Sequence, residues 1–244
     1  MLESGITAEA LWAKVPQLSG DDLPELIDHP ATGERHLVKV LLRPDLTGAF
    51  LSALARSRWS GFARIQFGII NHPRTPLPEA LNLVKFLAWR DLNHTLLNFK
   101  LASEVRHAAE SALIQRLPSL AVGEKITLAR LAGGQVLKAL RSETEPRVIS
   151  SLLENQRLVE EDVLYLANRP RTIAPVLEAV ARDERWSSRK EVRVALMRNP
   201  KAPLSVVAPF ISQMTKADLA PLADDLKVPL ALRRMIQTRL GKGG

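Results

Sequence analysis

Hydrophobic residues recur along this chain at spacings of three and four, the period at which side chains return to one face of an α-helix. Val192, Ala195 and Leu196 follow this spacing, as does the run from Val105 to Ala112. Aromatic residues, which favour strands, make up only 5% of the sequence. The 16 prolines fall mostly between the apolar segments, where they end helices or occupy a first helical turn. The pattern predicts an all-α protein.

The sequence repeats itself when it is shifted along its own length. A shift of 126 in the numbering aligns Arg43-Pro44 with Arg169-Pro170, Leu51 with Leu177 and Arg56 with Arg182. One inserted residue changes the shift to 127, which aligns Arg58-Trp59-Ser60 with Arg185-Trp186-Ser187, Pro73 with Pro200 and Asp91 with Asp218. These matches predict a tandem duplication. We expect an N-terminal capping helix over residues 1–25, a first half over 26–117, connecting helices over 118–151 and a second half over 152–244.

Each half also contains a shorter period of roughly 30 residues, within the range that is typical of helical repeats. Asn199-Pro200 follows Arg169-Pro170 at this spacing, and His72-Pro73 follows Arg43-Pro44 at a spacing shorter by one. One pair of helices has about this length in an α-solenoid, and such a pair must stack on its neighbours to bury its apolar face.

The turns of this period carry a family resemblance. The segments Asn71-His72-Pro73-Arg74-Thr75-Pro76 and Asn199-Pro200-Lys201-Ala202-Pro203 resemble the Asn-Pro-x-Thr-Pro turn of leucine-rich-repeat-variant proteins, within the HEAT/armadillo-like group. Residues 124–240 look like uncharacterised bacterial proteins of this kind. The resemblance implies a right-handed α-α superhelix and no activity. The chain departs from the family in one respect, because it has no cysteine to hold the iron–sulfur cluster that such proteins can carry.

Composition and motifs argue against catalysis. The absence of cysteine excludes disulfides, Cys-ligated zinc and thiol catalysis, and fits a reducing compartment. No apolar run approaches the ~18 residues of a membrane span, and Met1–Ser4 does not begin a secretory signal, so we expect a cytoplasmic protein. No two of the five histidines lie at i, i+4, and no glycine-rich phosphate loop or nucleophile elbow occurs. We expect no enzyme, metal or cofactor.

The charge of the chain is uneven. The 34 Lys and Arg exceed the 26 Asp and Glu, for a net charge of +8. Residues 1–118 hold 13 basic against 12 acidic residues, whereas residues 119–244 hold 21 against 14. Such an excess favours an acidic partner, which can be a nucleic acid, an anionic membrane surface or an acidic protein. The alternative is a charge that only keeps the protein soluble.

Two groups of residues are candidates for function. Trp59 and Trp186 stand at equivalent places in the two halves, which favours a packing role. The second group is a basic stripe. The pattern Ser188-x-x-Glu191 predicts that a helix starts near Ser188. On that helix Arg189 and Arg193 would share one face, because they are four residues apart. Beside an exposed edge of Trp186 the stripe could hold phosphates or an acidic segment. Its members are Arg185, Trp186, Arg189, Lys190, Arg193, Arg198 and Lys201. The first half has Phe62-Ala63 and Ile65-Gln66-Phe67 at the corresponding place. The alternative is that one helix is merely buried and the other exposed.

The leading hypothesis is a non-enzymatic helical repeat scaffold that binds a protein with an acidic surface. The second hypothesis is a nucleic-acid binder, at most an enzyme resembling the HEAT-like alkylpurine DNA glycosylases. A purely structural assembly module is a third possibility, and the sequence leaves the oligomeric state open.

Overall fold

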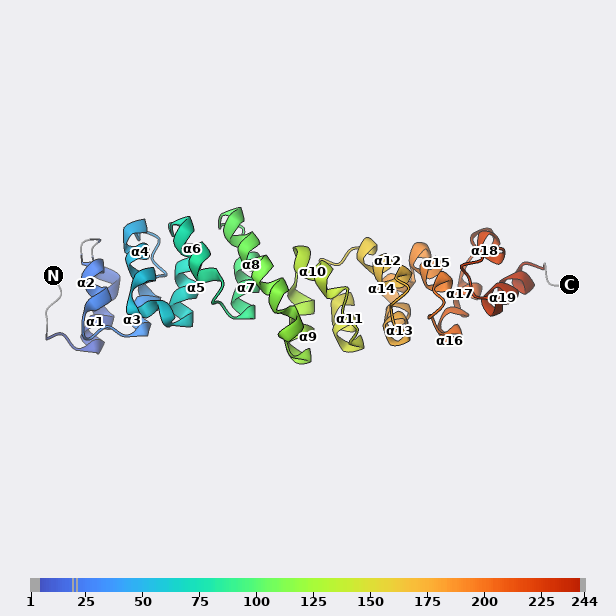
Figure 1. Cartoon of the computed structure of the whole chain (residues 1–244), viewed down its shortest axis with the longest axis horizontal. Helices are drawn as coiled ribbons and strands as arrows, with labels where there is room; N and C mark the ends of the chain where they lie inside the picture. The colour runs from blue at the N-terminus through green and yellow to red at the C-terminus, as the bar shows by residue number, and fades with distance from the viewer. Residues whose placement is uncertain (1–4, 19, 21, 242–244) are drawn as a thin grey trace. The chain divides into compact units, whose positions relative to one another are not determined.

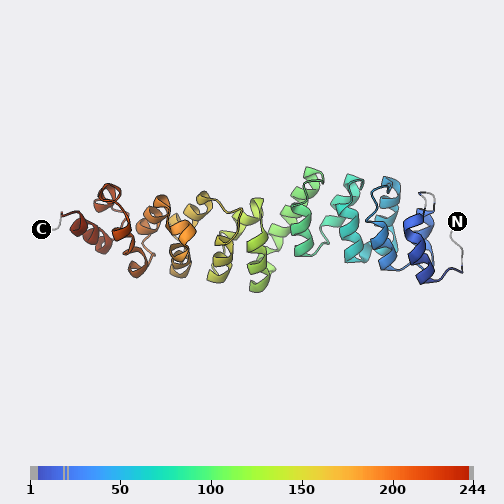
Figure 2. The ribbon, with the colours of Figure 1, turned by 180° about the vertical axis from the view of Figure 1, so that it is seen from behind.

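A computed structural model describes residues 5–18, 20 and 22–241. Those residues form an all-α protein, and no strand occurs among them. The chain divides into two compact units, Met1–Pro118 and Ser119–Gly244, in each of which helices follow one another in chain order (Figure 1, and from behind in Figure 2).

The first unit contains eight α-helices among the described residues. They are α1 (Ala8–Lys14), α2 (Leu23–Asp28), α3 (Glu34–Val40), α4 (Gly48–Arg56), α5 (Ala63–Asn71), α6 (Leu77–Val84), α7 (Trp89–Leu96) and α8 (Ser103–Arg116), with short 3-10 helices η1 (Val15–Gln17), η2 (Arg58–Gly61) and η3 (Leu117–Ser119). α2 packs on α4, α3 on α5, and α7 on α8. Each helix turns an apolar face inward, as Ile65 and Ile69 of α5 do, and this burial holds the stack together.

The second unit is also built of helices that pack on one another. Its helices are α9 (Val122–Leu131), α10 (Gly134–Leu140), α11 (Pro146–Leu153), α12 (Glu160–Asn168), α13 (Ala174–Arg182), α14 (Glu184–Ser187), α15 (Lys190–Arg198), α16 (Leu204–Val207), α17 (Phe210–Gln213), α18 (Lys216–Ala223) and α19 (Leu230–Leu240). α9 packs on α11, α11 on α13, α12 on α15 and α18 on α19. The residues expected to connect two halves, 118–151, thus include helices that pack within this unit.

A recurrent turn ends many of the helices. In these turns the backbone N–H of one residue donates to the carbonyl three positions earlier, as from Ala202 to Asn199. The accepting residues are His29, His72, Asn98, Asn155, Arg169, Asn199 and Asp225. All of these except Arg169 also use a side-chain atom to accept the N–H two positions later. Asn, Asp and His are frequent in these turns because their short side chains can satisfy a backbone donor that the helix end leaves open.

The same side chains tie one turn to the previous one. The Asn199 amide donates to the carbonyl oxygens of Ala167 at 2.7 Å and Arg169 at 3.4 Å, which belong to the end of α12. In the first unit the His72 imidazole bonds the carbonyl of Arg43 at 2.9 Å. A buried carbonyl left without a partner is costly, so these bonds explain why a polar residue is placed inside the stack.

One predicted helix start is wrong. α15 begins at Lys190 with Arg189 as its N-cap, and the predicted capping box from Ser188 to Glu191 does not form. The short helix α14 already uses Ser188 as its C-cap, and the Ser188 hydroxyl donates to the carbonyl of Arg185 at 3.4 Å.

Candidate binding surfaces

The residues of the predicted basic stripe take part in contacts within the second unit. The Arg185 guanidinium donates to the carbonyls of Asn155 at 3.4 Å and Leu158 at 3.5 Å. Arg189 forms an ion pair with Glu160 at 2.6 Å. These two arginines therefore tie α14 and the start of α15 to the segment between α11 and α12.

The next two members are likewise bound. The Lys190 ammonium lies 2.5 Å from Asp218 Oδ1, and this hydrogen bond raises the pKa of Lys190 and lowers that of Asp218. The Arg193 guanidinium donates to the carbonyls of Ser187 at 2.5 Å and Gln213 at 3.3 Å. Lys190, although exposed, is therefore paired with a carboxylate, and Arg193 uses its donors on two carbonyls of the same unit.

Arg198 and Lys201 belong to the other end of α15. Arg198 Nε donates to Asp225 Oδ2 at 2.7 Å. Lys201 occupies the third position of the Asn199 turn, is exposed, and has no carboxylate within ion-pair distance among the described residues. The seven predicted residues are thus divided between two ends of a nine-residue helix and its flanking segments.

Trp186 has no exposed edge. Its side chain is 1% exposed, and its indole N–H donates to the carbonyl of Leu153 at 3.2 Å. Trp59 is buried in the same way and donates to Ile27 at 2.8 Å. The exposed edge of Trp186 that was considered beside the basic stripe is therefore absent, and both rings pack inside their units. Arg185 and Arg189 lie over the Trp186 ring and help to cover it.

A different basic surface lies along the turns of the second unit. The turns that begin at Arg169, Asn199 and Asp225 are linked in series by the Asn199 and Arg198 bonds given above. Their third residues share one property: each is basic, exposed and without an ion pair among the described residues. They are Arg171, Lys201 and Lys227, which we call the basic turn edge. In the sequence, these residues could have been found as a Lys or Arg two positions after the residue that starts each turn.

A shallow groove of about 690 Å³ accompanies this edge, which we call the second groove. Leu226 beside it is 85% exposed, a high value for a large apolar side chain. The lining residues are Asn168, Pro170, Ala195, Arg198, Asn199, Pro200, Leu226 and Lys227. The second groove therefore combines an exposed apolar side chain, Leu226, with the cationic side chains of Arg198 and Lys227.

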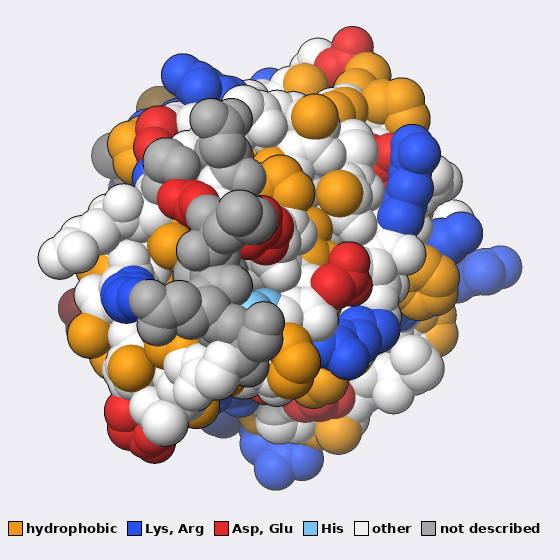
Figure 3. Space-filling view, turned by 90° about the vertical axis from the view of Figure 1, so that its left-hand side faces the viewer, with side chains coloured by type: hydrophobic (Ala, Val, Ile, Leu, Met, Phe, Trp, Pro, Cys, Tyr) orange, Lys and Arg blue, Asp and Glu red, His pale blue; other side chains and the backbone are white. Residues whose placement is uncertain are grey.

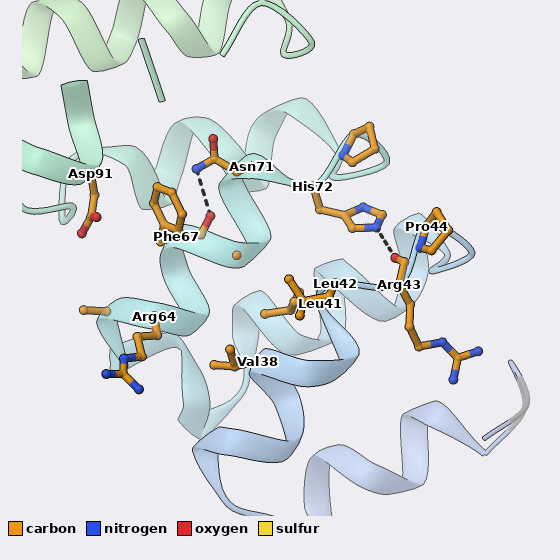
Figure 4. Close-up of a pocket in the computed structure, with 13 residues that line it drawn as sticks. Val38, Leu41, Leu42, Arg43, Pro44, Arg64, Phe67, Asn71, His72 and Asp91 are labelled. Atoms are coloured by element: carbon orange, nitrogen blue, oxygen red, sulfur yellow. Dashed lines mark hydrogen bonds between the residues drawn. The ribbon is translucent and has the colours of Figure 1, made fainter. Parts of the chain in front are cut away.

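The first unit has a groove of about 560 Å³, which we call the first groove (Figure 4). Apolar side chains of α5 and of the segment that ends α3 make much of its wall, and Leu42 is 81% exposed. The lining residues are Val38, Leu41, Leu42, Arg43, Pro44, Ala63, Arg64, Phe67, Gly68, Asn71, His72, Pro73 and Asp91.

The two grooves occupy matching positions in the sequence. Leu42 and Pro44 of the first groove correspond to Asn168 and Pro170 of the second at the shift of 126. Gly68, Asn71, His72 and Pro73 correspond to Ala195, Arg198, Asn199 and Pro200 at the shift of 127. The replacements of Leu42 by Asn168 and of Asn71 by Arg198 make the second groove the more polar one.

The described residues lack a metal-binding cluster and a helix that could span a membrane. They contain no group of three or more His, Asp or Glu that could hold a metal ion. None of their helices has the length and hydrophobicity needed to cross a membrane. At the amino-terminal end, acidic, basic and hydrophobic side chains are interspersed on the surface (Figure 3).

No family model, curated protein or solved structure matches this chain. The resemblance to leucine-rich-repeat-variant proteins therefore stays a prediction, and the function must be argued from the surfaces.

Proposed function

We propose that this protein is a non-enzymatic scaffold of the HEAT/armadillo-like type, built by tandem duplication, that binds a protein partner. The partner segment carries acidic and apolar side chains and lies along the basic turn edge and the second groove. The observation that carries this proposal is the repetition of a free, exposed cation on three consecutive turns.

Equivalent hydrogen bonds support the duplication. The Trp59–Ile27 and Trp186–Leu153 bonds join residues that correspond at shifts of 127 and 126. The Gln66 amide donates to the carbonyl of Ser60 at 2.6 Å, and Arg193, its counterpart in the second unit, donates to the carbonyl of Ser187. Bonds of this kind are specific to a packing arrangement, so their repetition supports a common ancestor for the two units.

The charge and shape of the edge favour an acidic protein segment. Exposed cations on a regular row attract carboxylates over about a Debye length, and the exposed Leu226 offers an apolar contact beside them. Nucleic-acid binding would gain from a dense set of free cations or from exposed aromatic rings. Here Arg189, Lys190 and Arg198 are already paired and Trp186 is buried, which favours protein over nucleic acid.

Fluorescence anisotropy of the full chain tests the proposal with two labelled probes: a peptide of alternating glutamate and leucine, and a DNA duplex of equal charge. We expect the peptide to bind, and the charge reversal Lys201→Glu/Lys227→Glu to weaken it about tenfold or more. The matched control is Lys138→Glu/Lys216→Glu, which reverses two exposed lysines of the same unit away from this edge.

Three outcomes would overturn the proposal. They are tighter binding of the duplex than of the peptide, an equal loss of peptide binding in the control variant, and no peptide binding at about 50 mM salt, where screening is weak.

A further inference from the structure

The polar groups along the wall of the first groove are already satisfied. The Asn71 amide donates to the carbonyl of Phe67 at 3.0 Å and to the Thr95 hydroxyl at 3.1 Å. His72 bonds the carbonyl of Arg43, and the Arg43 guanidinium pairs with Asp45 at 2.6 Å. The apolar wall formed by Leu41, Leu42 and Phe67 is what remains for an occupant to bind.

One end of the first groove carries charged side chains that have no ion-pair partner among the described residues. Arg64 and Asp91 lie on the side away from His72 and Pro44 (Figure 4). Neither forms an ion pair within the part of the chain that the structure describes, and Asp91 is half-buried. A half-buried carboxylate without a cation is a site of unused electrostatic attraction.

The second unit shows what the matching carboxylate does there. Asp218 is the counterpart of Asp91 at the shift of 127, and it is paired with Lys190 at 2.5 Å. The residue that matches Lys190 in the first unit is Ala63, which lines the groove. The first unit has therefore kept the carboxylate, and it has an alanine where the second unit supplies the ammonium.

We infer that the first groove is a second binding site, which takes an amphipathic helical segment of another protein through apolar side chains and a lysine or arginine. Leucine-like side chains of that segment rest on Leu41, Leu42 and Phe67. Its cation binds Asp91, as Lys190 binds Asp218 in the second unit. This site goes beyond the proposed function, because it lies in the other unit and selects the opposite charge.

The walls of the groove specify a helical occupant. The groove is lined by α5 and by the segments that follow α3 and α5, and no strand occurs among the described residues, so no sheet edge is offered for an added strand. An amphipathic helix fits such a site, because its backbone is hydrogen-bonded within itself and it presents apolar side chains on one face. The first unit also carries almost no net charge, because residues 1–118 have 13 basic against 12 acidic residues, so a cationic segment is not repelled at long range.

The test is anisotropy of the full chain with a labelled amphipathic helical peptide that carries leucines at i, i+3 and i+7 and a lysine beside them. The comparison peptide has glutamate in place of lysine. We expect the lysine peptide to bind more tightly. Asp91→Asn should lower the affinity for the lysine peptide about fivefold, which is the effect expected from the loss of one partly screened ion pair. Arg64→Gln should strengthen it, because a like charge at the same end is removed.

Ala63→Lys provides the sharpest variant, because it supplies the cation that the second unit already has. The new lysine should pair with Asp91, leave thermal unfolding unchanged or raise it, and reduce peptide affinity at least fivefold. Leu42→Asp, at an exposed position, should reduce the affinity at least tenfold without unfolding the protein. Lys201→Glu/Lys227→Glu should have no effect here, so failure of this site is distinct from failure of the proposed function.

Absence of lysine-peptide binding at millimolar concentration would overturn the inference. So would equal affinity for the glutamate peptide, or unchanged affinity in both Asp91→Asn and Ala63→Lys.

Discussion

The indole N–H of Trp186 donates a hydrogen bond to the carbonyl oxygen of Leu153, 33 residues earlier, at 3.2 Å. The bond joins α14 to the end of α11, in the interior of the second unit. Trp59 makes the same bond to Ile27 in the first unit. Since an indole has one donor and a helix end leaves carbonyls unbonded, each tryptophan satisfies a buried acceptor while it fills the space between two helices.

Removal of either ring should therefore be costly. We expect Trp186→Ala and Trp59→Ala each to lower the free energy of unfolding by about 3–5 kcal/mol, from a cavity and an unsatisfied carbonyl. Urea denaturation followed by circular dichroism measures this. Trp12, which is 38% exposed, is the control, and Trp12→Ala should cost much less. Equal losses at all three positions would contradict a special role for the two buried rings.

The buried turn residues should also be sensitive to substitution, though less so than the two tryptophans. Asn199 accepts the N–H of Lys201 at 3.0 Å and donates to two carbonyls of the preceding turn. Asn199→Ala leaves those buried groups unsatisfied, and we expect it to cost about 2–3 kcal/mol in urea denaturation. Asn199→Asp keeps the acceptor but places a buried carboxylate oxygen against the two carbonyls, so it should cost at least as much as alanine. A loss of less than about 0.5 kcal/mol for alanine would show that water replaces these bonds.

The sequence predicted the helices and the turns well because both depend on local patterns. The spacing of Val192, Ala195 and Leu196 and the Asn-Pro and His-Pro pairs are visible without tertiary information. Which basic residues are paired could not be predicted, because the carboxylates that pair with Arg189 and Arg198 lie far away along the chain. Glu160 and Asp225 are 29 and 27 residues from the arginines that they bind.

The ion pair and turn at Asp225 should make the free energy of unfolding depend on pH in the acidic range. The carboxyl accepts the N–H of Lys227 and the guanidinium of Arg198, and both bonds lower its pKa. A pKa that is lower in the folded than in the unfolded chain stabilises the fold above the usual Asp value of about 3.9. That stabilisation is lost as the pH falls through the lowered pKa.

Asp225→Asn measures this contribution, because it keeps an acceptor for Lys227 and removes the charge, as in the matching Asn98 turn. We expect the variant to be about 0.5 kcal/mol less stable near pH 7, a small value because the Arg198 side chain is partly exposed to solvent. The difference should shrink toward zero near pH 3. A difference that is constant from about pH 7 to 3 would exclude the ion pair as its cause.

Gly68 and Leu41 determine how closely α3 and α5 approach beneath the first groove. A Cβ at position 68 would lie 2.7 Å from Leu41 Cδ1 and 3.2 Å from Leu41 Cβ, so the leucine must move to admit it. In the second unit Ala167 stands at the position of Leu41 and Ala195 at the position of Gly68. The second unit thus has a smaller residue in place of the leucine and a larger one in place of the glycine. We expect Gly68→Ala to be neutral or destabilising in the native chain, because overpacking offsets its helix propensity gain of about 1 kcal/mol. In a Leu41→Ala background the same change should be stabilising, with a coupling energy of about 1–2 kcal/mol in a double-mutant cycle of urea unfolding. Additive effects would mean that the two residues do not compete for the same space, and the contrast between the two grooves would then need another origin.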